Sequence, residues 1–166
     1  MFYDESEQLF NGLIELIEKW KPKKFSSESE YQVDIYNYLK DLQDRGRIKE
    51  QRLIRREGGA NRVDIIVDKV GIELKKDLKT QPSVDRAVAQ ITRMIREFNY
   101  MIVVLVGENK RQSIDLFKHA LKDLINDKEI FVEQKRIKII DINSKGNNKQ
   151  EETLEPLAWN IDTSLP

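Results

Sequence analysis

The chain has 166 residues, which is enough for one domain with a sizeable core. Its 29 basic and 29 acidic residues give a formal net charge of zero, which is not the global signature of a nucleic-acid-binding protein. The absence of cysteine excludes disulfides, thiolate zinc sites and cysteine nucleophiles. We expect a cytoplasmic protein without a membrane segment, because no apolar run approaches the roughly 20 residues that span a bilayer and the acidic N-terminus does not resemble a secretory signal.

Two amphipathic helices are expected first. Apolar residues recur at helical spacing over residues 5–20, and Pro22 follows them. A second helix is predicted to begin near Ser27, because Ser27 and Glu30 have the spacing of a capping box, and to stop near Gly46.

Three strands are expected next, over residues 48–56, 62–68 and 70–75. A glycine-rich turn at 58–61 and the short connection Asp68-Lys69 separate them. Connections this short join antiparallel neighbours, so the three strands should form a meander.

The remaining chain alternates helix and strand, which is typical of helical crossovers in one sheet. Residues 100–106 form a nearly continuous apolar run, which indicates a strand buried on both faces and central or parallel in the sheet. We predict a single α/β domain over residues 1–166, with a core at about 27–142 and a tail at 143–166 that docks on the body or on a second subunit. The further expected elements are a helix at 83–98, a helix at 112–126 and a strand at 136–142.

Charged residues interrupt two of the apolar strands. Asp64 lies between apolar neighbours, and Glu73 and Lys75 alternate with Ile72 and Leu74. Because strand side chains alternate between faces, Glu73 and Lys75 share one face, about 7 Å apart. On the next helix, Arg86, Gln90 and Arg93 follow at spacings that place them on one face.

This order of residues resembles the PD-(D/E)XK superfamily, the restriction-endonuclease-like nucleases. The resemblance covers roughly residues 30–106 and lies in Asp64, the Glu73-Leu74-Lys75 element and Gln90 on the following helix. It implies a three-layer fold with a central mixed β-sheet flanked by helices, and a metal-dependent nuclease. Asp64 follows Val63 instead of the proline in the family name, a proline that family members often lack.

The resemblance also implies a role for each residue. Asp64 and Glu73, with the Leu74 carbonyl, would hold Mg²⁺ or Mn²⁺, which prefers oxygen ligands and activates a bound water. Lys75 would orient that water or stabilise the developing negative charge, and Gln90 would position water or phosphate. An acidic residue on an upstream helix is common in the family, and Glu30 is the candidate. Phosphate contacts are expected from Arg62, Lys76, Arg86 and Arg93.

Other interpretations remain open from the sequence. Glu73 and Lys75 could form an ordinary surface ion pair, Glu30 could serve only as a cap, and Arg86 and Arg93 could be solvated. The whole chain could be a catalytically inactive member of the fold that binds nucleic acid or a protein, or an unrelated α/β protein. DNA is the expected substrate because most of the superfamily acts on it, and a homodimer is expected because duplex cleavage needs two cuts.

Overall fold

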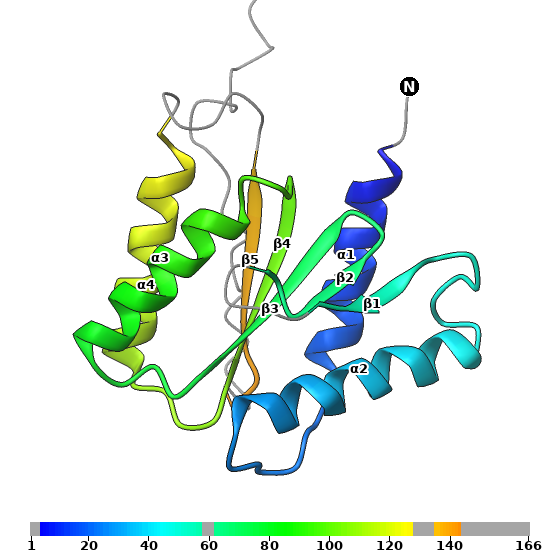
Figure 1. Cartoon of the computed structure of the whole chain (residues 1–166), viewed down its shortest axis with the longest axis horizontal. Helices are drawn as coiled ribbons and strands as arrows, with labels where there is room; N and C mark the ends of the chain where they lie inside the picture. Colours follow the sequence, from blue (N-terminus) through cyan, green and yellow to red (C-terminus); the bar gives the residue numbers. More distant parts are fainter. Residues whose placement is uncertain (1–3, 58–61, 128–134, 144–166) are drawn as a thin grey trace, which may run out of the picture.

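The fold is a five-stranded mixed β-sheet with helices on both faces (Figure 1). The computed structural model describes residues 4–57, 62–127 and 135–143. Within these ranges the chain forms helices and strands in the following order: α1 (Glu5–Glu18), α2 (Glu28–Asp44), β1 (Ile54–Arg56), β2 (Ile65–Val67), β3 (Val70–Lys76), α3 (Gln81–Met94), β4 (Tyr100–Val106), α4 (Arg111–Ile125) and β5 (Arg136–Asp141).

The strands lie in the sheet in the order in which they occur in the chain. Strands β1, β2 and β3 are antiparallel neighbours, so the predicted meander is confirmed. Strand β4 is parallel to both β3 and β5, as expected for a strand that is buried on both faces and reached by helical crossovers. The α/β class and the mixed sheet are therefore as predicted.

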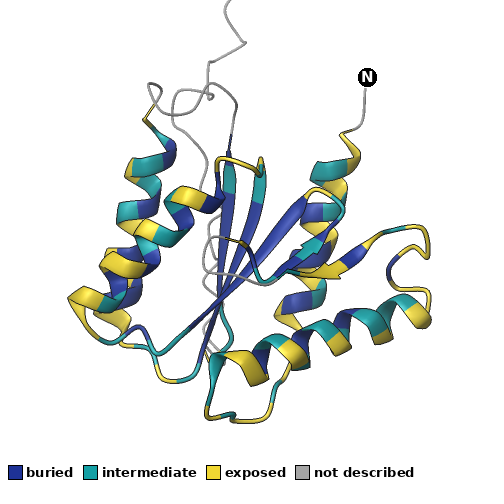
Figure 2. Cartoon of the chain, in the orientation of Figure 1, coloured by how far each residue is buried: buried dark blue, intermediate teal, exposed yellow. Residues whose placement is uncertain are grey.

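Two hydrophobic clusters lie on opposite faces of the sheet, which makes the molecule three-layered (Figure 2). Helices α1 and α2 pack on one face, where Ile72 and Leu74 of β3 are fully buried. Helices α3 and α4 pack on the other face, against Val103 and Leu105 of β4. Alternation along each strand thus sends apolar side chains to both layers.

Several predicted boundaries are wrong: β1 begins at Ile54 and not at residue 48, β2 begins at Ile65 and not at residue 62, and α3 spans Gln81–Met94 and not residues 83–98. Side-chain hydrogen bonds explain two of these differences. Strand β1 does not extend over residues 48–53, because the Gln43 amide donates to the carbonyls of Lys49 and Arg52 at 3.0 and 2.8 Å and holds that segment in turns. Helix α3 begins at Gln81 instead of residue 83, because Thr80 and Ser83 form a reciprocal capping box. The intervening proline occupies the first turn, where its missing N–H is no loss.

Other expected features fall where predicted or outside the described residues. Helix α2 is capped by Ser27, and Gly46 follows its last turn with a positive φ of 76°. The expected turn at 58–61 and residues 144–166 of the expected tail lie outside the described residues. Within the ranges that the structure describes, no helix has the length and apolarity needed to cross a bilayer.

Candidate functional site

Strands β2 and β3 part from each other near the middle of β3. Their last paired residues are Ile65 and Ile72, whereas β3 continues to Lys76 beside β4. The edge of β3 that faces β2 therefore has no strand partner over its last four residues among the described strands. Asp64, immediately before β2, lies at this fork.

Carboxylates take the place of the missing strand at the fork. The Leu74 N–H donates to Asp64 Oδ2 at 2.8 Å, and the Lys76 N–H donates to Glu28 Oε2 at 3.1 Å. In return the Asp64 N–H donates to Glu73 Oε2 at 3.1 Å. Buried backbone donors need partners, and here acidic side chains supply them. Two acids are thereby fixed along the open edge of β3.

Glu73 and Lys75 lie buried on the α3 side of the sheet, with exposures of only 3% and 8%. The Lys75 ammonium donates to Glu73 Oε1 at 2.7 Å and to Gln90 Oε1, from helix α3, at 2.6 Å. Hydrogen bonds therefore link Asp64, Glu73, Lys75 and Gln90 in one network. The structure brings together these four residues, which the sequence grouped as a candidate site.

Burial and neighbouring negative charge together shift the pKa values of the acids in the network. Burial, and then the nearby Glu73 and Glu28 carboxylates, raise the pKa of Asp64 to about 8, against the Leu74 N–H and Lys75, which lower it. Burial also raises the pKa of Glu73, with a smaller contribution from Glu28, while Lys75 opposes the shift. Glu28 therefore raises the pKa of both acids, whereas the Lys75 ammonium lowers both.

The predicted helix acid is wrong: the structure places Glu28, not Glu30, at this site. The Glu30 carboxylate accepts from the Ser26 N–H at 3.1 Å and is exposed, in agreement with its alternative interpretation as part of a helix cap. Successive helical residues are about 100° apart, so Glu30 lies about 160 to 200° from Glu28 and Gln32 around α2.

Gln32 is a further site residue that the sequence interpretation missed. Its Nε2 donates to Asp64 Oδ1 at 2.7 Å. Glu28 and Gln32 are four residues apart and so share one helical face. That spacing is the sequence signal that could have identified both, once the apolar face of α2 had been placed against the sheet.

The predicted phosphate-binding cations are not hydrogen-bonded to the acidic network. Arg86 and Arg93 are exposed on α3, and Arg62 is exposed and pairs with Glu57 at 3.3 Å. The Lys76 ammonium pairs with Asp77, although its backbone N–H binds Glu28. Arg86 and Arg93 do share helix α3 with Gln90, at spacings that place the three on one face of the helix.

The donor chemistry fits a hard divalent cation in part. In a strand, the N–H and C=O of one residue point to the same side, so the Leu74 carbonyl is expected to face the fork together with its N–H. Two carboxylates, a carbonyl and waters match the way proteins bind Mg²⁺. Within the described ranges, however, no three His, Cys, Asp or Glu side chains are arranged to bind a metal by themselves. A cation here would need backbone and water ligands as well.

Comparisons with protein-family models, with curated proteins and with solved structures gave no match for this chain. The chemistry of the fork is therefore the basis for inferring a function.

Proposed function

We propose that this protein is a Mg²⁺- or Mn²⁺-dependent nuclease that hydrolyses phosphodiester bonds of DNA, with a restriction-endonuclease-like fold of the PD-(D/E)XK type. The observation that carries the proposal is the network at the fork, in which Asp64 and Glu73 are linked by a hydrogen bond, the buried Lys75 ammonium donates to Glu73, and the Glu28 carboxylate lies close enough to raise the pKa of Asp64. Excess negative charge in a partly buried site is the environment that a divalent cation stabilises.

Asp64 and Glu73, with the Leu74 carbonyl, would hold the cation, and Glu28 would add a further negative charge beside it. When bound, the cation would polarise the scissile phosphate and lower the pKa of a water ligand. Lys75 has three N–H donors, of which Glu73 and Gln90 accept two. Its third donor would stabilise negative charge on the phosphate.

Gln90 would act beside Lys75. Its carbonyl oxygen accepts from the Lys75 ammonium, which orients the amide and leaves its NH₂ group to donate. That NH₂ group would position the attacking water or a phosphate oxygen. The proposed substrate is DNA, as in most of the superfamily, and a homodimer would supply the two cuts that duplex cleavage requires. Light scattering of the intact chain tests the dimer.

A second candidate is a non-catalytic module of the same fold. The observation in its favour is that Asp64, Glu73 and Glu28 all accept hydrogen bonds from the protein, so the network is complete as a structural support for β3. This candidate predicts that the protein has no affinity for divalent cations.

Cleavage assays separate the two candidates. The substrates are duplex, single-stranded, flap and junction DNA, and RNA, each with Mg²⁺, Mn²⁺ or chelator. We expect Asp64→Asn and Lys75→Ala each to lower the cleavage rate by about 10³-fold, as removal of a group that stabilises the transition state does. Glu30→Gln is the matched control, an acid on α2 away from the fork, and should retain the wild-type rate within about twofold.

Calorimetric titration with Mn²⁺ gives an independent readout. Wild type and Glu30→Gln should bind the ion, and Asp64→Asn should not. Cleavage that is equal in wild type and Asp64→Asn would refute this site, and absence of both cleavage and Mn²⁺ binding would favour the non-catalytic module.

A further inference from the structure

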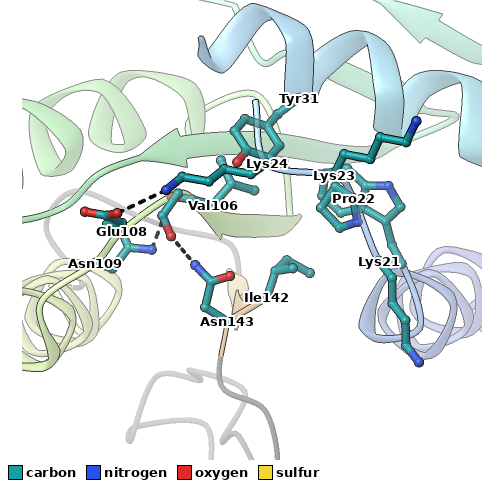
Figure 3. A pocket seen from close by; sticks show the side chains of 12 residues that line it. Lys21, Pro22, Lys23, Lys24, Tyr31, Val106, Glu108, Asn109, Ile142 and Asn143 are labelled. Atoms are coloured by element: carbon teal, nitrogen blue, oxygen red, sulfur yellow. Dashed lines mark hydrogen bonds and ion pairs between the residues drawn. The ribbon is translucent and has the colours of Figure 1, made fainter. Parts of the chain in front are cut away.

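A pocket of about 510 Å³ lies on the α1–α2 side of the sheet, at the carboxyl ends of the parallel strands (Figure 3). Its apolar lining comes from the loop between α1 and α2, from helix α2, and from the ends of β4 and β5: Trp20, Pro22, Tyr31, Val106 and Ile142. The volume lies in the range of small-molecule sites, and the carboxyl edge of parallel strands is where open α/β sheets bind ligands.

Three lysines of the α1–α2 loop lie at the mouth of this pocket. Lys21, Lys23 and Lys24 line it, and all three are exposed. In Figure 3, Lys21 and Lys23 extend outward from the loop on either side of Pro22, whereas Lys24 runs along the rim to Glu108. Glu108 accepts from Lys24 at 3.4 Å and from Lys79 at 3.0 Å. The mouth therefore carries more positive than negative charge, although the whole chain is neutral.

The wall of the pocket at the ends of β3 and β4 is held rigidly. The Glu108 N–H donates to Asp77 Oδ1 at 2.7 Å, and the Leu78 N–H donates to Asn109 Oδ1 at 2.7 Å. Asp77 and Gly107 both have positive φ angles, of 58° and 74°. A conformation that is unfavourable for Asp77 is kept because these bonds fix it, so the wall is preorganised.

The pocket adjoins the acidic network through helix α2. Tyr31 lines the pocket and lies three residues after Glu28, which is at the fork. Side chains three apart on a helix are neighbours, with Cβ atoms about 5 to 6 Å apart. A DNA strand bound at the fork would reach the pocket by passing the first turns of α2, where Glu28 and Tyr31 lie.

We infer that the pocket binds an unpaired nucleotide of a DNA strand, so that the preferred substrate is single-stranded or frayed DNA. The apolar walls would receive the base, and Lys21, Lys23 and Lys24 would contact the phosphates at the mouth. Apolar and aromatic surfaces bind any base, and lysines bind the backbone without reading sequence. The inference rests on the proposed function for the strand's position at the fork, but its test does not require cleavage.

Fluorescence anisotropy of the full chain with a labelled 12-mer oligothymidylate in chelator tests the inference. The wild type should bind this strand more tightly than a blunt duplex of equal length. The triple variant Lys21→Gln, Lys23→Gln, Lys24→Gln should raise the Kd about tenfold and reduce the salt dependence, because each lost phosphate contact lowers the slope by about 0.7. The control triple Lys69→Gln, Lys118→Gln, Lys122→Gln removes the same charge from other surfaces and should change the Kd by about twofold at most.

Two substitutions at Asn143 test whether a base enters the pocket. Asn143 lines the pocket, and its amide donates to the Gly107 carbonyl at the mouth. Asn143→Phe should raise the Kd about fivefold by filling the space that a base would occupy, since one base stack is worth at least that much. Asn143→Ala loses the same hydrogen bond but leaves the space, and should bind like wild type.

Each contrary result overturns the inference. Equal weakening by the two lysine triples would mean diffuse charge attraction, and unchanged binding by Asn143→Phe would mean that no base enters the pocket. Tighter binding of free thymidine monophosphate than of the 12-mer would identify a small-molecule site. If the binding results are as expected but no cleavage is found, the pocket would still be a nucleotide-binding site, and only the proposed nuclease activity would be refuted.

Discussion

Strands β3 and β4 are parallel neighbours of seven residues each, and they differ most where Glu73 lies beside Val103 and Lys75 beside Leu105. All four side chains are buried. Strand β4 has a strand on each side and an apolar helix layer above Val103, whereas β3 borders the fork, where the Asp64 N–H and Gln90 supply polar partners. Burial alone therefore does not exclude charged side chains from this sheet. A buried position accepts a charged side chain where the neighbouring residues supply hydrogen-bond partners.

The largest loss of stability is expected when a charged side chain is introduced into β4. Val103→Glu places a carboxylate among apolar side chains, and we expect it to lower the free energy of unfolding by about 4 kcal/mol or to prevent folding. Urea unfolding measures the loss. Val33→Glu is the control, because Val33 is 39% exposed and the change should cost under about 0.5 kcal/mol. Similar small losses in both variants would contradict this explanation of β4.

Removing the buried ammonium group of β3, that of Lys75, should cause the next largest loss of stability. Lys75→Met leaves the Glu73 carboxylate buried without its ammonium, which should cost about 3 kcal/mol at pH 8. The loss should shrink at low pH, because Glu73 can then take up a proton. Adding Glu73→Gln should recover most of the stability, since the buried charge is gone. A double variant as unstable as Lys75→Met would mean that Lys75 acts by packing and not by charge.

The effect expected at Asp64 depends on pH and is small only at acid pH. Its raised pKa means that the folded protein keeps a proton that the unfolded chain loses above about pH 4, so stability falls as pH rises from there to about 8. Asp64→Asn removes this dependence, so its stability relative to the wild type should rise between pH 5 and pH 8 in the metal-free protein, by up to about 1.4 kcal/mol per pH unit. Thermal unfolding from pH 5 to pH 9 in chelator measures the difference. Parallel curves for wild type and variant would show that Asp64 does not titrate in this way.

Much of the sheet could be predicted from the sequence, because the pattern of apolar residues along a strand indicates which of its faces are buried and whether it is parallel to its neighbours. The apolar run at 100–106 coincides with β4, and the alternation around Glu73 and Lys75 gave their shared face. The interruption of an apolar strand by Asp64 likewise identified a candidate site residue, which the structure places at the fork. In each case the evidence was local, within a few residues of the side chain concerned.

What the sequence did not reveal depends on contacts between distant segments. The Gln43 amide prevents a strand at 48–53 through hydrogen bonds that cannot be predicted from the spacing of apolar residues. The preference for Glu28 over Glu30 follows from the rotation of α2 against the sheet, which only packing determines. The lysines of the α1–α2 loop line the same pocket as Ile142 and Asn143 because the fold brings these distant segments together.

The conformation and surroundings of Gly107 restrict which residues can replace it. A methyl group there would come within 2.3 Å of Asp77 Oδ1, and the φ of 74° disfavours any other residue. Gly12, in contrast, has nothing within 4 Å of the place a methyl group would take. In a library of random mutants selected for folded protein, position 12 should therefore drift to alanine and other helix formers, while position 107 should stay invariant.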